Sequence, residues 1–583
     1  MKKLLAYMKG YYKECIISPL FKMLEAVFEL LVPLVIANII DIGIANKDKG
    51  YVIKMCLVLV AFAIVGLSCT LIAHYFAAKV AVGFSCKVKH SLFSHIQSLS
   101  YSEIDDLGTS TMITRMTSDM NQVQTGVNLT LRLFMRSPVV VFGAMIMAFY
   151  VDRTSASFFD RPATTFVIAI PLLAIIVFSI MCASIPLFKK VQMKLDKVLN
   201  RTRENLSGVR VIRAFGKEND EIGEFKKEAS SLFSAQTFVG KISAIMNPAT
   251  FAIINLAIVM LIWNGAIQVN SGSLSQGQVI ALYNYMSQIL VELIKLANLI
   301  INITKSVACG NRVQAVFEIS PSIKDDALDT APMIMSENAV DFRNVSMTYL
   351  KASESSLDDI DFSVKHGETV GIVGATGSGK TTLINLISRF YDVSSGEVLV
   401  DGINVKSYRS EELLSKIGIV PQKAVLFRGS LRDNMKWGNE NASDDEIIEA
   451  IKSAQGADIL LSKKEGLDFF IEQGGKNLSG GQKQRLTIAR ALVKKPSILI
   501  LDDSSSALDF ATDASLRKSI SELDFKPTVF IVSQRASSVM HADKIIVLDD
   551  GKCVGIATHS ELLKQCSVYA EIYASQFGKE SIA

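Results

Sequence analysis

The stretch Gly374-Ala-Thr-Gly-Ser-Gly379-Lys380-Thr381 follows the apolar run Val370–Val373 and precedes a helical pattern over Thr381–Phe390. A glycine-rich loop between a strand and a helix lets backbone N–H groups surround phosphate oxygens at the positive end of the helix dipole. In such a loop the lysine reaches the β- and γ-phosphates of ATP, and the following hydroxyl ligates Mg²⁺. The residues expected to bind the nucleotide are Gly374, Thr376, Gly377, Ser378, Gly379, Lys380, Thr381 and Thr382.

The rest of the second half alternates strand-like and helical runs from Val340 onward, which is typical of an α/β domain with a largely parallel sheet. One apolar run, Ile498–Leu501, ends at Asp502, where a carboxylate can contribute to the same Mg²⁺ site as Thr381. A buried aspartate at a strand end can also be purely structural. We expect this domain over residues 339–575, after a Pro- and Asp-containing linker over 311–338 and before a short tail over 576–583.

The first half of the chain is strongly apolar. Of the 583 residues 49% are hydrophobic, and the mean hydropathy is +0.32. A net charge of +4 is small for this length, so nucleic acid is not implied as a partner. A run of about 20 apolar residues can cross a bilayer. Six such runs are found within residues 14–310, at approximately 16–42, 52–79, 128–150, 163–188, 244–269 and 278–304.

The connections between these spans predict the topology. Those after the second and fourth spans are long and keep an apolar periodicity, so we expect membrane helices prolonged into water; the one after the fourth span, like the amino end, is also rich in Lys and Arg. By the positive-inside tendency these connections and both termini are cytosolic, in a multi-pass protein of the cell membrane. Residues 1–13 mix lysine with apolar side chains and predict an interfacial elbow helix. The eight cysteines lack metal-type spacing and are expected to be free thiols.

Further motifs complete a family resemblance. The order Gly374–Thr381, Gln422, Leu478–Gln482, Asp502 and Ser506–Asp509 resembles the nucleotide-binding domain of an ATP-binding cassette (ABC) transporter. The six preceding spans are similar to the membrane domain of an ABC exporter half-transporter. The resemblance covers essentially the whole chain. It implies a six-helix membrane domain with long cytosolic extensions, followed by an α/β P-loop domain, in a subunit that uses ATP and Mg²⁺ to export a substrate.

The resemblance also implies roles for single residues. Tyr349 corresponds to the aromatic residue that stacks on adenine; the alternative is a strand tyrosine in the core. Gln422 corresponds to the glutamine that senses Mg²⁺ and the membrane domain. Asp509 corresponds to an aspartate at the dimer interface. The residues implied to contact the γ-phosphate of ATP held by the opposite subunit are Ser479, Gly480, Gly481 and Gln482.

Two cytosolic segments are also similar to the family. Gly108–Asp119 and Glu204–Glu218 correspond to regions that hold the coupling helices, which rest on the nucleotide-binding domains. Together with six complete spans, these segments argue against a purely regulatory ATP-binding subunit without a transport path.

Two catalytic positions depart from the family pattern. Asp503 stands where such domains usually have glutamate, and Gln534 where they usually have histidine. Aspartate is shorter by one methylene, about 1 Å, and a misplacement of that size costs on the order of 100-fold in rate. Glutamine can donate a hydrogen bond to a phosphate but cannot take up a proton.

The segment Leu478–Gln482, called the signature motif below, keeps the family sequence, whereas Asp503 and Gln534 do not. This combination resembles the degenerate-site half of a heterodimeric ABC exporter of the multidrug type. The expected partner is a second half-transporter with glutamate and histidine at the corresponding positions. The alternatives are a homodimer with two slow sites that exports a lipid or peptide, and, less in keeping with the six spans, an ATP-binding regulatory subunit.

Three acidic residues lie within the predicted spans. Glu25 and Glu29 share one helix face, and Glu292 lies in the sixth span with Lys295. Ionisable residues at membrane depth are costly and usually face a cavity or a partner. One interpretation is an acidic cavity that favours hydrophobic or cationic small molecules. The other is that the acids pair with Lys22 or Lys295 and hold the helices together.

Overall fold

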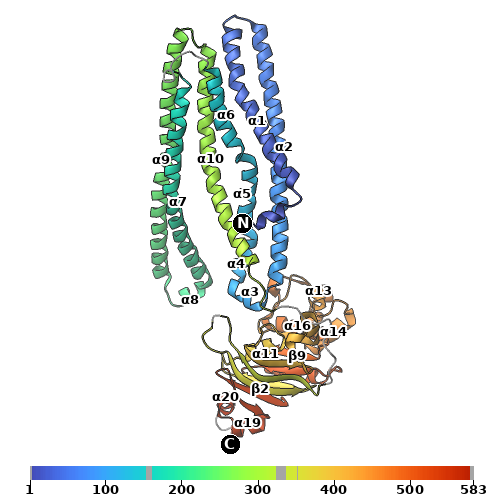
Figure 1. Cartoon of the computed structure of the whole chain (residues 1–583). Helices are drawn as coiled ribbons and strands as arrows, with labels where there is room; N and C mark the ends of the chain where they lie inside the picture. Colours follow the sequence, from blue (N-terminus) through green and yellow to red (C-terminus); the bar gives the residue numbers. More distant parts are fainter. Residues whose placement is uncertain (1–2, 153–160, 324–335, 351, 578–583) are drawn as a thin grey trace. The chain divides into compact units, whose positions relative to one another are not determined.

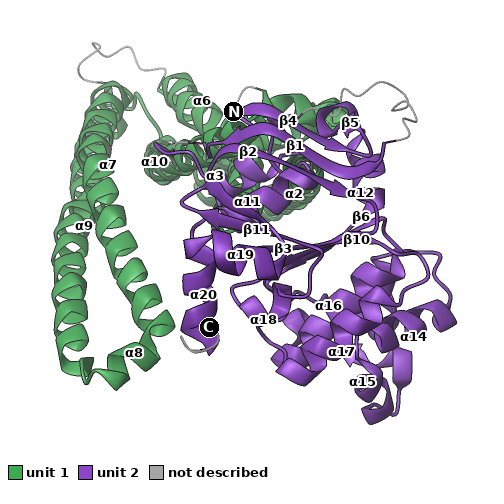
Figure 2. Cartoon of the chain, turned by 90° about the horizontal axis from the view of Figure 1, so that it is seen from below, with its two compact units in different colours: residues 1–97, 109–319 green, residues 98–108, 320–583 purple. Residues whose placement is uncertain are grey.

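The computed structural model describes residues 3–152, 161–323, 336–350 and 352–577. The chain forms two compact units (Figure 2). Unit 1 comprises residues 1–97 and 109–319, and unit 2 comprises residues 98–108 and 320–583. The helices of unit 1 that are long and apolar enough to cross a membrane are Tyr12–Ile44, Lys49–Gln97, Thr109–Val151, Thr164–Ser207, Glu218–Asn270 and Gln276–Phe317. The predicted six membrane helices are therefore confirmed.

Several of these helices are much longer than a bilayer is thick. Helices α2 (Lys49–Gln97) and α9 (Glu218–Asn270) have 49 and 53 residues. At about 1.5 Å per residue each extends more than 70 Å, against a hydrocarbon core of about 30 Å. Figure 1 shows α9 beside α7 (Thr164–Ser207), with the short α8 (Val209–Ala214) joining their ends. The apolar periodicity in the long connections thus does continue the membrane helices.

The first and third spans contain irregularities. Residues Leu4–Met8 form a short 3₁₀ helix, η1, where an elbow helix is predicted, and α1 (Tyr12–Asn38) follows and ends in a π-helical turn, η2 (Ile39–Ile44). The third span, predicted as one helix over 128–150, is divided into α5 (Met120–Leu133) and α6 (Arg136–Val151).

The division has a local cause. Pro138 has no N–H to donate, and its ring clashes with the carbonyl of residue 134, so the helix breaks just before it.

The core of unit 1 is centred on α10 (Gln276–Phe317), which packs against α1, α5, α6 and α9. Tyr285 of α10 is fully buried, and its hydroxyl donates a hydrogen bond to the Leu30 carbonyl of α1 at 2.7 Å. A buried phenol needs such a partner. This contact joins the first and last membrane helices.

Unit 2 contains two main sheets. The larger one has the strand order β12-β11-β3-β10-β9-β6, parallel except for β12. Its strands are β3 (Thr369–Gly374), β6 (Ile417–Val420), β9 (Ile498–Asp502), β10 (Thr528–Val532), β11 (Lys544–Asp549) and β12 (Lys552–Ala557). The smaller, antiparallel sheet was not predicted. Its strands are β1 (Asn338–Met347), β2 (Leu357–Lys365), β4 (Ser395–Val400) and β5 (Ile403–Asn404).

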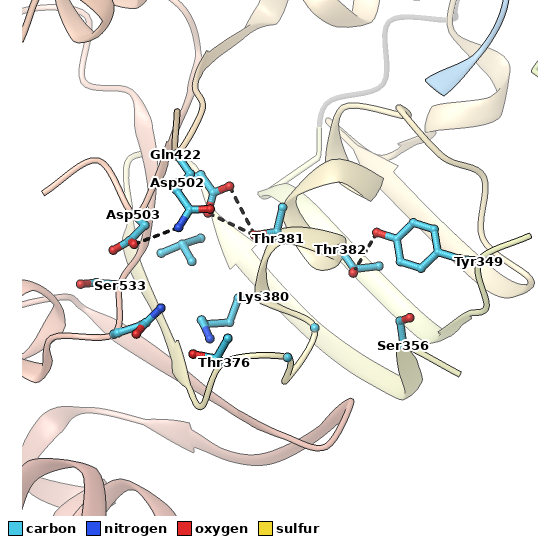
Figure 3. A pocket seen from close by; sticks show the side chains of 14 residues that line it. Tyr349, Ser356, Thr376, Lys380, Thr381, Thr382, Gln422, Asp502, Asp503 and Ser533 are labelled. Carbon is cyan, nitrogen blue, oxygen red and sulfur yellow. Dashed lines mark hydrogen bonds between the residues drawn. The ribbon is translucent and has the colours of Figure 1, made fainter. Parts of the chain in front are cut away.

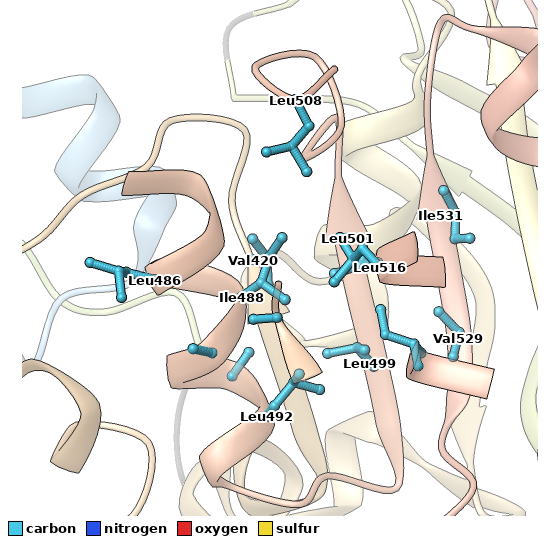
Figure 4. Packing of buried hydrophobic residues seen from close by; sticks show 14 of the residues in the cluster. Val420, Leu486, Ile488, Leu492, Leu499, Leu501, Leu508, Leu516, Val529 and Ile531 are labelled. Carbon is cyan, nitrogen blue, oxygen red and sulfur yellow. The ribbon is translucent and has the colours of Figure 1, made fainter. Parts of the chain in front are cut away.

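Helices pack against the parallel sheet and fix the position of the strands that carry site residues. Leu486, Ile488 and Leu492 of α16 (Gly480–Val493) are buried in one cluster with residues of β6 and β9 (Figure 4). Each such buried side chain contributes about 1.5–3 kcal/mol. The remaining α-helices and strands of unit 2 are α11 (Lys380–Ile387), α12 (Ser410–Lys416), α13 (Leu431–Lys436), α14 (Asp444–Ser453), α15 (Ala457–Ser462), α17 (Phe510–Ser521), α18 (Ala536–Val539), α19 (His559–Gln565), α20 (Ser567–Phe577), β7 (Gly429–Ser430) and β8 (Phe470–Ile471).

The structure shifts two of the predicted boundaries. Helix α10 runs to Phe317, into the predicted linker 311–338, because Val313 and Val316 are buried and residues 311–320 contain neither Gly nor Pro. Most of the remaining linker lies outside the described residues. The predicted tail begins within α20, and residues 578–583 are not described.

The first cytosolic segment also differs from the prediction. The short helix that belongs to unit 2 is α3 (Tyr101–Leu107), which lies before Gly108–Asp119. Gly108–Asp119 itself forms α4 (Thr109–Thr114) and a π-helical turn, η3 (Arg115–Asp119). A capping box between Ser100 and Glu103 starts α3, and Gly108 ends it with a φ of +71°.

Candidate nucleotide site

A cavity of about 330 Å³ in unit 2 collects most of the predicted site residues (Figure 3). It lies at the carboxyl ends of β3, β6, β9 and β10, the edge where ligands bind in open α/β sheets. The residues that line it are Tyr349, Ser356, Thr376, Gly377, Gly379, Lys380, Thr381, Thr382, Gln422, Asp502, Asp503, Val532, Ser533 and Gln534.

The loop between β3 and α11 requires its glycines. Gly377 and Gly379 have φ values of +88° and +96°, a region that residues with a side chain rarely adopt. A Cβ atom on Gly374 would lie 2.1 Å from the Leu548 carbonyl oxygen, and one on Gly379 would lie 2.6 Å from that of Ser356. The loop therefore turns tightly and leads directly into the N-terminus of α11.

Lys380 is buried under this loop. Its ammonium donates hydrogen bonds to the carbonyls of Gly374 and Ala375 at 2.8 and 2.6 Å. Burial lowers the pKa of Lys380, and the charges of Asp503 and Asp502 oppose that shift. Within the described chain, no carboxylate lies within ion-pair distance of this ammonium. A buried cation bonded only to neutral oxygens is suited to an anionic ligand such as a phosphate.

Thr381 and Asp502 form an oxygen-only pair of ligands. The Thr381 hydroxyl lies 3.3 and 3.4 Å from the two carboxylate oxygens of Asp502. Burial raises the pKa of Asp502, and the neighbouring charge of Asp503 raises it further. One hydroxyl, one carboxylate and ligand phosphates are the donors that Mg²⁺ prefers, so these residues fit that ion. Among the described residues, no group of three or more His, Cys, Asp or Glu side chains could hold a metal alone.

Asp503 follows in a strained conformation. Its φ is +44°, and its N–H donates to the Val532 carbonyl at 2.9 Å. Its carboxylate accepts a hydrogen bond from the Gln422 amide at 3.3 Å. Non-glycine residues in this region cost about 1–3 kcal/mol and are concentrated at functional sites. Asp503, Gln422 and Gln534 thus line one cavity; their catalytic role stays a prediction.

Sequence reasoning missed the residue that holds the Gln534 segment. The Gln576 amide of α20 donates to the Gln534 carbonyl and accepts from the Ala536 N–H, both at 2.8 Å. Gln576 is the first residue of the predicted tail, 576–583. No pattern in the sequence marks a contact between residues forty or more positions apart.

Tyr349 lies at the other end of the cavity. Its ring is half-buried, and its hydroxyl shares a hydrogen bond with the Thr382 hydroxyl at 3.0 Å. An aromatic face beside the first turn of α11 can bind a base while the loop binds phosphates.

The signature residues do not line this cavity. Ser479 caps α16 by accepting a hydrogen bond from the Gln482 N–H at 3.3 Å, and the Gln482 side chain accepts one from the Ser479 N–H. Ser479 and Gly480 are exposed at the start of the helix. Gly481 and Gln482 also lie outside the cavity. This capped N-terminus can bind an anion at a second, external position.

Asp509 also lies outside the cavity and caps α17. It accepts a hydrogen bond from the Thr512 N–H at 2.8 Å. Backbone hydrogen bonds of this kind lower the pKa of Asp509, so the exposed carboxylate stays charged.

Unit 1 contains a second cluster of charges at membrane depth. Arg136 of α6 donates to Glu29 of α1 at 2.6 Å and also donates to Glu292 of α10. Lys295 pairs with Glu292 at 2.8 Å, and Lys22 with Glu25 at 2.5 Å. Three cations therefore balance three carboxylates. Glu29, Glu292 and Lys295 line a cavity of about 310 Å³ with Asn284, Ser287 and Gln288.

Sequence reasoning missed Arg136, the centre of this cluster. The signal was an arginine inside an apolar span, two residues before Pro138. The break that Pro138 causes places Arg136 at the first position of α6.

Known proteins with the same architecture identify the family. The chain is 36% identical over 580 residues to the ABC transporter ATP-binding protein YfiB of Bacillus subtilis (strain 168), covering 100% of this chain and 99% of the relative. This chain belongs to the ABC transporter family. Residues 15–293 match the model of the ABC transporter transmembrane region, and residues 357–506 match that of the ABC transporter.

Other relatives are similar over the whole length. YgaD of the same organism, whose name refers to multidrug export by an ATP-binding/permease protein, is 30% identical over 99% of both chains. The fold matches the structure of a bacterial Atm1-family ABC exporter with ATP bound, with a TM-score of 0.78, 23% identity and coverage of 97% of this chain and 98% of that one. The protein is thus an ATP-driven ABC exporter of a bacterial membrane, and its second unit is an ATP-binding domain.

Proposed function

We propose that this chain is one half of a heterodimeric ABC exporter whose own ATP site hydrolyses slowly. The observation that carries the proposal is the pair Asp503 and Gln534 at the hydrolytic end of a cavity that is otherwise complete. Lys380, Thr381 and Asp502 supply the groups for tight Mg-ATP binding. Bound Mg²⁺ neutralises phosphate charge and orients the phosphates.

The altered residues explain slow hydrolysis in physical terms. A general base must come within hydrogen-bond distance of the attacking water. The Asp503 carboxylate is one methylene short of that reach and already accepts a hydrogen bond from Gln422. Gln534 can orient a phosphate oxygen, but it cannot carry the positive charge of a protonated histidine. The site therefore holds ATP for long periods.

The signature supports the assignment to a heterodimer. Ser479 and Gly480 are exposed and lie outside this chain's own cavity, at the capped N-terminus of α16. In the arrangement we propose, this helix end completes the ATP site of a partner that has glutamate and histidine at the altered positions. Asp509 would lie at the interface with that partner.

We further propose that hydrophobic or cationic small molecules, drugs or lipid-like compounds, leave the cytosol through the membrane domain. The support is the name of the relative YgaD, which refers to multidrug export, and the cavity in which Glu29 and Glu292 stand beside apolar residues such as Val32 and Val291. Glu25 does not line this cavity; it pairs with Lys22 at 2.5 Å and lies 3.9 Å from Arg136. Both termini are cytosolic in this proposal, and membrane lipids surround the six helices.

The test compares the chain alone with the chain co-expressed with its partner in lipid vesicles. We expect the chain alone to bind ATP but to hydrolyse it slowly, and the heterodimer to show drug-stimulated ATPase activity and transport. Asp503→Glu together with Gln534→His should raise the rate of the chain alone. Full-rate hydrolysis and transport by the unmodified chain alone would contradict the heterodimer and favour a homodimer.

A further inference from the structure

A short helix from between two membrane helices packs within unit 2. Residues 98–108 join α2 to α4 along the chain, yet they fold with the ATP-binding domain. The Tyr101 ring of α3 stacks on Phe390, with centroids 4.4 Å apart and planes inclined by 26°. The Tyr391 hydroxyl donates a hydrogen bond to the Asp105 carboxylate of α3 at 2.6 Å. Two consecutive aromatic residues therefore hold this helix.

Tyr391 also contacts the nucleotide cavity. Its ring meets the Tyr349 ring edge to face, with centroids 5.1 Å apart and an interplanar angle of 85°. Aromatic rings favour edge-to-face contact, and such a pair adds stabilisation beyond that expected from the surface area that it buries. Tyr349 lines the cavity and shares a hydrogen bond with Thr382. One side chain thus touches both the wall of the cavity and α3.

The phosphate loop reaches the same place through α11. This helix begins at Lys380 and ends at Ile387, a length of about 12 Å. The chain then turns sharply, with Arg389 at a φ of +50° and the Phe390 N–H donating back to the Asn385 carbonyl at 3.0 Å. Phe390 and Tyr391 are therefore fixed to the far end of the helix whose first turn binds phosphates.

We propose that Tyr391 is a positioning residue that couples occupancy of the adenine end of the ATP site to the position of α3. The proposal rests on the adenine-binding role proposed above for Tyr349. It differs from the sensing role of Gln422, which lies at the opposite end of the cavity beside Asp503. An adenine ring against Tyr349 restrains that side chain, which restrains Tyr391 through the ring contact and α3 through the Asp105 hydrogen bond.

The chemistry of the Tyr391 hydroxyl suits this role. Burial and the hydrogen bond to Asp105 raise the pKa of Tyr391, so the phenol stays protonated and donates at every physiological pH. Asp105 lies on the exposed side of the contact, so the bond is made and broken without burying a charge. In a site that holds ATP for long periods, this contact keeps α3 restrained while the partner's site turns over.

The test measures hydrogen exchange of the peptide covering residues 98–108 in the full-length protein in lipid nanodiscs, with and without Mg-ATP. ATP should slow exchange in the wild-type protein. Tyr391→Phe keeps the ring contact but removes the donor, and Asp105→Ala removes the acceptor. Both should bind ATP within twofold of wild type and lose about fivefold of the ATP-induced protection, the equivalent of one net hydrogen bond.

Two variants serve as matched controls. Asp105→Asn retains an oxygen acceptor and should keep the protection. Tyr101→Phe removes a phenol from the same helix, and the structure gives that hydroxyl no hydrogen bond within the described ranges, so protection should be unchanged. If ATP binds but protects residues 98–108 equally in all four variants, the coupling through Tyr391 is wrong. If the wild-type chain does not bind ATP, the proposed function fails as well.

Discussion

Two groups of buried charges in this protein are arranged in opposite ways. In the nucleotide cavity, Lys380 bonds to backbone carbonyls, and Asp502 accepts, among the described side chains, from the Thr381 hydroxyl. In the membrane domain, Arg136 pairs with Glu29 and Glu292, so the charges satisfy one another. The charges of the nucleotide cavity are not paired with each other and are suited to bind a ligand, whereas those of the membrane domain pair with each other and join helices. The first group costs stability until ATP binds, and the second maintains it.

The largest effect is expected from breaking the membrane cluster. Arg136→Met leaves Glu29 and Glu292 without their shared partner. Removing one member of a buried ion pair typically costs about 3–5 kcal/mol; because Lys295 still pairs with Glu292 and Glu29 is partly exposed, the cost should lie at the lower end of that range. Thermal unfolding of the purified protein in detergent should therefore shift to a markedly lower temperature.

The matched control for Arg136 is Arg201→Met. Arg201 forms looser, partly exposed pairs with Glu221 and Glu224 at 3.6 and 3.4 Å, which are worth about 1 kcal/mol or less. Replacing Arg136 together with Glu29 and Glu292, as Arg136→Met, Glu29→Gln and Glu292→Gln, should recover much of the lost stability, because Lys295, which then loses Glu292, is partly exposed. An unfolding temperature of Arg136→Met equal to that of Arg201→Met would show that the cluster is not structural.

The next effect is expected in the nucleotide cavity. Lys380→Ala removes the buried cation that faces the phosphates, and charge-assisted hydrogen bonds contribute about 1.5–3 kcal/mol each. ATP affinity, measured with a fluorescent analogue, should fall on the order of 100-fold. Lys518→Ala, at an exposed lysine of the same unit, should bind normally. If Lys380→Ala bound ATP as tightly as wild type, Lys380 would not be a phosphate-binding charge, and the two groups of charges would not differ in this way.

The smallest effect concerns the stability cost of Asp502. Burial raises its pKa, so the ionised carboxylate destabilises the nucleotide-free fold at neutral pH. Asp502→Asn should therefore unfold at a higher temperature than wild type at pH 7 without ligand. The difference should shrink as the pH falls through the raised pKa, because the wild-type carboxyl then becomes neutral in the folded state. Added Mg-ATP should stabilise wild type more than the variant.

The sequence predicts local features well in both units. The six membrane helices follow from hydropathy, and the glycine loop follows from Gly374, Gly377 and Gly379, whose conformations the structure requires. The capping box of Ser100 and Glu103 is also a local pattern, and it predicts a helix that begins at Tyr101, before the segment Gly108–Asp119. Local patterns therefore predict helix starts as well as spans.

Long-range contacts could not be predicted in this way. Tyr391 bonds to Asp105 across 286 residues, and Arg136 bonds to Glu292 across 156. Each pair is chosen by how whole elements pack, and a single sequence contains no periodicity that marks such partners. Arg136 was visible as a costly residue in an apolar span, but its partners on two other helices were not.

The most direct test of the central claim is the fate of ATP bound at this chain's own site. The full-length chain in lipid nanodiscs is loaded with radiolabelled ATP and Mg²⁺, chased with excess unlabelled ATP, and the bound label is separated into ATP and ADP over time. We predict that the label remains ATP in the wild-type chain and becomes ADP quickly when Asp503→Glu and Gln534→His are combined. Rapid conversion in the wild-type chain, at the rate of the double variant, would contradict a slow site.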